Sequence, residues 1–200
     1  IWGDEPNGNA YDIACVRVAD FDRVKNRIAD RDMTVRNISK IQLRNKLLQN
    51  GDLLLEKSGG GDLQPVGAVV LYDKDLPAVC SNFVARMPAA NGYVPQFLCY
   101  LHAALYAARL NVRSIKQNTG IQNLDSESYL NERIGLPTLS EQSDIVAFLD
   151  RETAKIDALI AKKERLIELL EEKRCVLVSH AVTKGTNPQV PMKHSGTDRF

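Results

Sequence analysis

A long, uninterrupted heptad pattern near the C-terminal end constrains the fold of this chain more than any other feature. From Ile145 to His180, mostly apolar residues recur at alternating steps of four and three, the spacing of a coiled-coil seam. Ser140 can cap a helix start, and neither Pro nor Gly follows before Gly185. We therefore expect one helix over 140–183, about 60 Å long. The residues predicted to pair with another helix are Ile145, Leu149, Ile156, Leu159, Leu166, Leu170 and Leu177.

A helix of this kind cannot bury its apolar seam on itself. The roughly 140 residues before it form too compact a domain to cover that length. The partner helix is then expected from a second copy of the chain, which gives a homodimer, or from another part of a longer polypeptide. The plainer alternative is a long surface helix that packs on its own domain.

The residues before Leu139 predict an α+β domain. Short apolar or alternating runs bounded by turn residues indicate strands at 15–18, 51–56, 66–72 and 80–87. The second and third runs are predicted to form a hairpin with a flexible Gly-rich tip at 58–61. Pro95 favours a helix start, and an apolar face continues to Leu110. The expected organisation is a globular domain over 1–139, the long helix over 140–183 and a tail or linker over 184–200.

The sequence lacks the motifs of several classes of function. No apolar run approaches the roughly 18 residues of a membrane span, and the four cysteines are scattered without a CxxC pair. The three histidines stand outside any motif, and the Gly-rich 58–61 segment lacks the end of a phosphate-binding P-loop. We expect no catalytic residues, no metal and no cofactor, and a cytoplasmic protein.

Charge is distributed unevenly along the chain, although the net charge is only +1. Residues 17–46 hold nine Lys and Arg against four acids, and residues 109–123 hold three basic residues and no acid. Two such stretches could fold onto one face and meet phosphate groups. The alternative is a pair of solvent-exposed surface segments without a ligand.

Several short motifs resemble those of the specificity subunits of type I restriction-modification systems. The segment GLPTLSEQSDIVAFLD at 135–150 is similar to the entry of the conserved helix in that family, and SHAVTKG at 179–185 is similar to its exit. TGIQNL at 119–124 resembles the signature that closes the recognition domains, and WGDEP at 2–6 and GDLL at 51–54 match earlier landmarks. The resemblance covers nearly the whole chain.

This resemblance implies a non-catalytic, sequence-reading subunit. In the family, one polypeptide carries two recognition domains, each reading half of a split site in double-stranded DNA, and two conserved helices that pair antiparallel as a spacer. Separate modification (methyltransferase) and restriction subunits do the chemistry. The tail 190–200 resembles the start of a second recognition segment, so we expect the first half of a longer subunit; a natural half that homodimerises is the alternative.

Candidate DNA contacts divide by side-chain chemistry, because backbone contacts position a protein and base contacts specify the sequence. Amide side chains can pair with adenine, and basic side chains suit phosphates or a groove. The basic candidates are Arg27, Arg31, Arg36, Arg113 and Lys116; the amides are Gln117, Asn118 and Gln122; Lys57 and Ser58 lie at the Gly-rich tip. The main alternative is a coiled-coil interaction protein without sequence-specific DNA binding, and a small nuclease ranks third.

Overall fold

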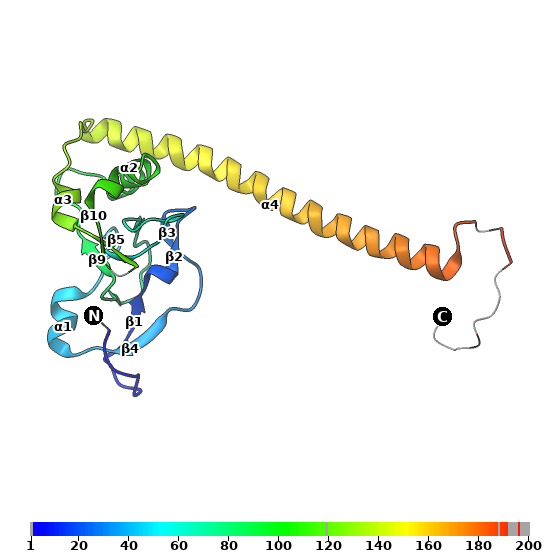
Figure 1. Cartoon of the computed structure of the whole chain (residues 1–200), viewed down its shortest axis with the longest axis horizontal. Helices are drawn as coiled ribbons and strands as arrows, with labels where there is room; N and C mark the ends of the chain where they lie inside the picture. The colour runs from blue at the N-terminus through cyan, green and yellow to red at the C-terminus, as the bar shows by residue number, and fades with distance from the viewer. Residues whose placement is uncertain (1, 119, 188, 192–195, 197–200) are drawn as a thin grey trace. The chain divides into compact units, whose positions relative to one another are not determined.

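The computed structural model describes residues 2–118, 120–187, 189–191 and 196, without the side chains of Asn45 and Asn118 (Figure 1). Two compact units divide the chain, Ile1–Val146 and Ala147–Phe200. The first unit holds the three β-sheets and the shorter helices, and the second consists mainly of the long helix. The expected fold class, a mixed α and β domain followed by a long helix, is confirmed.

A five-stranded sheet, here the central sheet, organises the globular unit. Its strands, in spatial order, are β2 (Phe21–Asp22), β3 (Arg27–Ile28), β7 (Val69–Leu71), β5 (Leu53–Glu56) and β9 (Val84–Met87). Strands β5 and β7 pair antiparallel, which confirms the predicted hairpin. The continuous apolar run Leu53–Leu55 suits the interior strand β5, because its two faces are both covered.

Alternation along β5 separates two parts of the core. Leu54 packs in one cluster with Val16 and Ala78, whereas Leu53 and Leu55 pack on the opposite face with Cys99. Cys99 lies in α2 (Pro95–Ala107), which therefore covers that face. Figure 1 shows α2 in green next to the strands of this sheet.

A three-stranded flanking sheet covers the other face of the central sheet. Its strands are β4 (Thr34–Asn37), β1 (Asp12–Val16) and β8 (Ala78–Cys80). Val16 of β1 faces the central sheet, while Cys15 faces outward toward Ile38 and Leu43. Leu43 belongs to α1 (Lys40–Lys46), so the unit has the layer order α2, central sheet, flanking sheet, α1.

One predicted strand proved wrong in an informative way. The strand predicted over 80–87 instead contains the last residue of β8, the turn at Ser81–Phe83 and all of β9. Strand β8 belongs to the flanking sheet and β9 to the central sheet, so the chain must change direction between two packed layers. Continuous β propensity does not reveal such a crossing.

The predicted helix after Pro95 is confirmed but ends earlier, at Ala107. Val94 is the N-cap and Pro95 occupies the first turn, where its missing N–H costs nothing. Arg109 then adopts a left-handed conformation with φ of 61°. The chain continues as a 3-10 helix, η2 (Leu110–Ser114).

A second three-stranded sheet, here the small sheet, follows η2. Its order is β10 (Ile115–Asn118), β11 (Ile121–Leu124) and β6 (Ser58–Gly59). The short helix α3 (Ser126–Leu130) follows and brings Tyr129 to His102 of α2, with 2.8 Å between the Tyr129 hydroxyl and His102 Nδ1. Burial lowers the pKa of His102 to about 4, so the imidazole is neutral at pH 7.

The long helix α4 spans Leu139–Lys184, a length of about 70 Å. Its expected cap was misassigned: the Thr138 hydroxyl accepts the Glu141 N–H at 3.4 Å, and Ser140 lies inside the first turn. Gln142 is buried, where its Oε1 accepts the Val94 N–H and its Nε2 donates to the Pro137 carbonyl, each at 3.0 Å. The sequence-predicted seam did not reveal this anchor.

Candidate nucleic-acid interface

The small sheet gathers predicted contact residues from distant parts of the sequence. Lys116, Gln117 and Asn118 lie on β10, Gln122 on β11 and Ser58 on β6. Lys57 immediately precedes β6, and Arg113 lies two residues before β10. Strand β11 pairs antiparallel with both neighbours, so seven of the ten predicted DNA-contact residues lie on or next to one sheet. The side chain of Asn118 lies outside the described part of the structure.

The register aligns three polar residues in a row across the small sheet. Lys116 is opposite Asn123, and Asn123 is opposite Ser58. Directly opposed residues share a face, and along β11 Asn123 is exposed whereas Gln122 and Leu124 are buried. The exposed face therefore presents an ammonium, an amide and a hydroxyl group side by side, called the polar row below.

An acid holds the cation at one end of the polar row. Lys116 Nζ lies 2.6 Å from Asp125 Oδ2, and Asp125 also caps α3 by accepting the Ser128 N–H. The hydrogen bond from Lys116 lowers the pKa of Asp125, and the same bond raises the pKa of Lys116. Arg113 is exposed and forms no ion pair within the described ranges. The charge of Arg113 is therefore less neutralised than that of Lys116.

Gln122 has a structural position rather than a surface one. Its side chain is buried and its Oε1 accepts the Val66 N–H at 3.1 Å. Gly60 of the Gly-rich segment lies close to Val66, since a Cβ at Gly60 would overlap the Val66 backbone nitrogen. Gln122 thus holds the base of this loop, and the expected base contact does not fit its burial. Gln117, its partner across the strands, is exposed.

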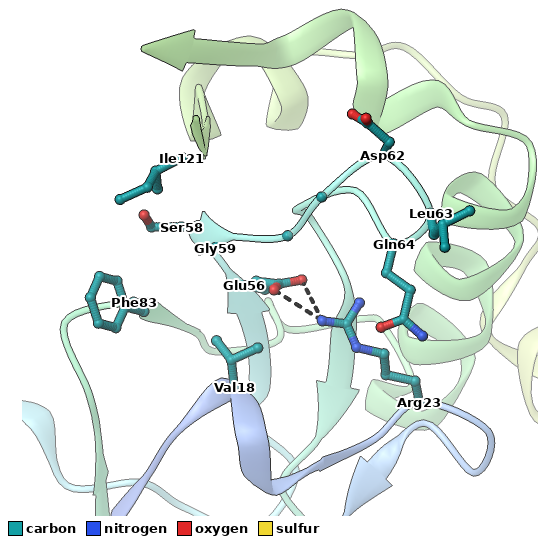
Figure 2. Close-up of a pocket in the computed structure, with 12 residues that line it drawn as sticks. Val18, Arg23, Glu56, Ser58, Gly59, Asp62, Leu63, Gln64, Phe83 and Ile121 are labelled. Atoms are coloured by element: carbon teal, nitrogen blue, oxygen red, sulfur yellow. Dashed lines mark hydrogen bonds and ion pairs between the residues drawn. The ribbon is translucent and has the colours of Figure 1, made fainter. Parts of the chain in front are cut away.

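A groove of about 850 Å³ adjoins the exposed face of the small sheet (Figure 2). Ser58 and Ile121 belong to both the sheet and the groove. Figure 2 shows these two side chains with Phe83 on one side of the hollow and Leu63 on the other. Phe83, Ile121 and Leu63 are each more than half exposed, so the walls are apolar and open to solvent.

A buried ion pair forms part of the lining of the groove. Arg23 Nη2 donates to both Glu56 oxygens at 3.0 Å, as the dashed lines in Figure 2 show. Arg23 also donates to the Tyr106 hydroxyl, which in turn donates to the Pro65 carbonyl. Burial raises the pKa of Glu56, against the lowering effect of Arg23. The network fixes both sides of the Gly-rich loop and positions the groove walls.

The three other predicted cations lie outside the small sheet. Arg27 is on β3 and pairs with Asp73 at 3.4 Å, and Arg31 lies 3.7 Å from Asp20. Arg36 is on β4, where it pairs with Glu5 and lies over the Trp2 ring at 4.7 Å. Each arginine has an acidic partner, and a basic face shared by these residues and the small sheet stays a prediction.

A family comparison decides where this chain belongs. Residues 25–169, well over half of the chain, match the model of the type I restriction modification DNA specificity domain. The chain belongs to this family. The matched range includes the small sheet, the central sheet apart from β2, most of the groove lining and the first thirty-one residues of α4.

Solved structures share the fold of this specificity domain at low sequence identity. One is a chain of a type I R-M system described for its complex assembly and conformational transition, with 18% identity and a TM-score of 0.64. Another is the HsdS subunit from Thermoanaerobacter tengcongensis, with 17% identity and a TM-score of 0.59. Each match covers 90% of this chain but only 42% and 45% of those chains, respectively. A search of curated proteins found no match.

The specificity domain's long helix exposes most of its predicted pairing residues. Ile145 and Leu149 are half-buried, and the five others are roughly half exposed: Ile156, Leu159, Leu166, Leu170 and Leu177. Ile160, Ile167 and Val176 widen this apolar stripe and are exposed too. Pairing of the helix stays a prediction.

Metal sites and membrane spans are both absent from the residues that the structure describes. They contain no group of three or more His, Cys, Asp or Glu residues placed to hold a metal ion. No helix among them is long and apolar enough to cross a membrane.

Sequence reasoning missed several residues of the candidate interface. Asn123 stands in the polar row, and Phe83, Ile121 and Leu63 form the groove walls. The alternation of β11 could have indicated Asn123 if the hairpin 115–124 had been recognised. The groove walls carry no comparable signal, because they come from separate segments.

Proposed function

We propose that this chain reads DNA sequence within a type I restriction-modification assembly, with the small sheet and the adjoining groove as its DNA-contacting surface. The supporting observation is the polar row, which places Lys116, Asn123 and Ser58 on the exposed face of one sheet in a member of the specificity-domain family. A two-stranded β-ribbon, such as the antiparallel pair β10 and β11, can enter the major groove of DNA.

The residues of this surface divide into positioning and reading groups. Arg113 and Lys116 suit phosphate contacts, because their charges supply the salt-dependent, sequence-independent part of binding. Asn123 and Ser58 suit base edges, since amides pair with adenine and hydroxyls accept or donate. Gln117 lies on the opposite face of the small sheet, in register with Gln122, and is not part of this group. Phe83 and Ile121 offer apolar contact to sugars or to a thymine methyl group.

The long helix α4 has a separate part in the proposal. We infer that it pairs with another helix, from a second copy or from a further segment of a longer subunit, and so holds the reading domain at a fixed distance from a second half-site. The modification and restriction subunits supply the catalysis. The domain limits 1–139, 140–183 and 184–200 remain part of this proposal.

The competing function is a coiled-coil interaction protein that does not read DNA. The exposed apolar stripe of α4 favours an interaction surface, but by itself this stripe is equally compatible with a DNA-reading subunit. DNA binding by the globular unit therefore discriminates between the two functions.

The test is an equilibrium titration of the full chain with a duplex at several salt concentrations. Arg113→Ala with Lys116→Ala should weaken binding and make the slope of log K against log salt less negative by about 0.9 for each phosphate that is no longer neutralised. Lys25→Ala with Lys74→Ala removes the same charge from outside the small sheet and serves as the control. An unchanged slope in the first variant removes these residues from the interface.

A further inference from the structure

A second hollow, of about 420 Å³, lies next to the groove and is lined by basic side chains. Lys46 comes from the end of α1, Lys57 precedes β6, and Arg86 lies on β9. Lys57 lines this second hollow while the adjacent Ser58 lines the groove, and the Lys57 N–H donates to the Phe83 carbonyl of the groove wall at 2.8 Å. The two hollows therefore share one wall.

The charge of this second hollow is positive. Its lining includes Lys46, Lys57 and Arg86 and no acid. Arg86 Nε donates a hydrogen bond to Asp52 Oδ2 at 2.6 Å. This bond fixes the guanidinium group and leaves the N–H donors on its two terminal nitrogens for other partners. The two lysines form no ion pair with any described residue. Three cations with one acidic partner attract an anion.

Cys80 lines the same hollow as the two lysines. Burial raises the pKa of the Cys80 thiol, and the positive charges of Lys46 and Lys57 oppose that rise.

Ser81 supplies a second, independent observation. Its side chain is buried at 1% exposure and lines the hollow, and its Oγ has no hydrogen-bond partner among the described residues. A buried hydroxyl without a hydrogen-bond partner costs free energy. An oxyanion in the hollow would accept the Ser81 O–H and remove that cost. Asn82, also in the lining, adds an amide donor.

We propose that this hollow binds a phosphate group of the DNA backbone, held by Lys46, Lys57, Arg86 and the Ser81 hydroxyl. The proposal rests on the proposed function, because the shared wall places such a phosphate beside the groove that faces the bases. A backbone phosphate suits the site because each of its two non-bridging oxygens can accept more than one N–H, so an arginine and two lysines can share them. The site fixes the register of the duplex and carries no sequence preference.

The test uses a double variant that carries both Lys46→Ala and Lys57→Ala. Duplex-binding titrations compare it with the wild-type full chain. We expect at least about tenfold weaker binding, because charge-assisted hydrogen bonds to the phosphate are removed, and a salt slope less negative by about 0.9. Lys40→Ala, at the other end of α1 and outside the lining, is the matched control and should bind like wild type. Ser81→Ala removes the hydroxyl and no charge, so its affinity should fall while its slope stays unchanged.

A titration with inorganic phosphate, followed by amide NMR shifts, separates this site from the proposed function. Shifts at Lys57, Ser81 and Arg86 in wild type that vanish in the double variant support the site even if duplex binding fails. The phosphate site is overturned if wild type binds duplex DNA and both the double variant and Ser81→Ala match it in affinity and in salt slope. The DNA-reading proposal stands in that case.

Discussion

The globular unit and the long helix differ in how far their apolar side chains are buried. In the first, Leu54 and Leu55 are fully buried between packed layers. In the second, Ile156 and Leu177 remain more than half exposed at heptad spacing. A helix with this stripe gains little from its own ion pairs, such as Lys155 with Glu152, because each contributes only a few tenths of a kcal/mol. The first unit closes its own core, and the second leaves an apolar stripe exposed.

The largest expected effect concerns the proposed pairing of α4. Leu159→Asp with Leu166→Asp places two charges in the apolar stripe, so self-association through α4 should be lost, because burying an unpaired carboxylate is strongly unfavourable. Sedimentation velocity measures the change. Ala154→Asp with Ala161→Asp puts the same charges at exposed alanines away from the stripe and should leave association intact. Sedimentation profiles identical to wild type for the first variant contradict the pairing role.

The next effect concerns the core of the globular unit. Leu54→Ala should lower the free energy of unfolding of the globular unit by about 2–5 kcal/mol, because it leaves a cavity between the central and flanking sheets. Leu170→Ala on α4 is the matched control and should cost much less in the unassociated chain. Denaturant unfolding is followed by Trp2 and tyrosine fluorescence for the globular unit and by far-ultraviolet circular dichroism for α4. Equal losses would mean that α4 is as well packed as the globular unit.

A smaller effect is expected from pH at His102. Its folded pKa of about 4 lies below the ordinary value of 6.5, so the unfolded chain binds the proton more readily and acid favours unfolding. The His102 contribution to stability is complete above pH 6.5 and falls progressively toward pH 4, by at most about 3 kcal/mol. His102→Gln should flatten the pH dependence of unfolding in this window. His180→Gln on α4 is the control, and equal flattening by both variants contradicts the burial argument.

The long helix could be predicted well because its signals are local. Heptad spacing and the absence of Pro and Gly place it at 140–183, against the observed Leu139–Lys184. Gly185 then adopts φ of 73° at the helix end, a conformation that glycine adopts without strain. The cap was displaced by two residues, to Thr138, because Ser140 and Thr138 have the same capping chemistry.

The interface was harder to predict because it depends on non-local pairing. Strand β6 pairs with β11 across more than sixty residues of sequence, and no local pattern gives that register. Gln122 shows the consequence: its amide suits base recognition, yet pairing turns it inward to bind the Val66 N–H. The basic residues Arg27, Arg31 and Arg36 were similarly predicted without their acidic partners, which come from other segments in most cases.

The most direct test of sequence reading by the small sheet is selection of bound duplexes from a random pool with the full chain. We expect enrichment of a short motif by wild type. Asn123→Ala and Ser58→Ala should relax the preference at one or two positions, since one good base contact discriminates by about 1–3 kcal/mol. Arg113→Ala with Lys116→Ala should weaken binding evenly across sequences. No enrichment by wild type, or a motif that Asn123→Ala and Ser58→Ala leave unchanged, would contradict sequence reading by this surface.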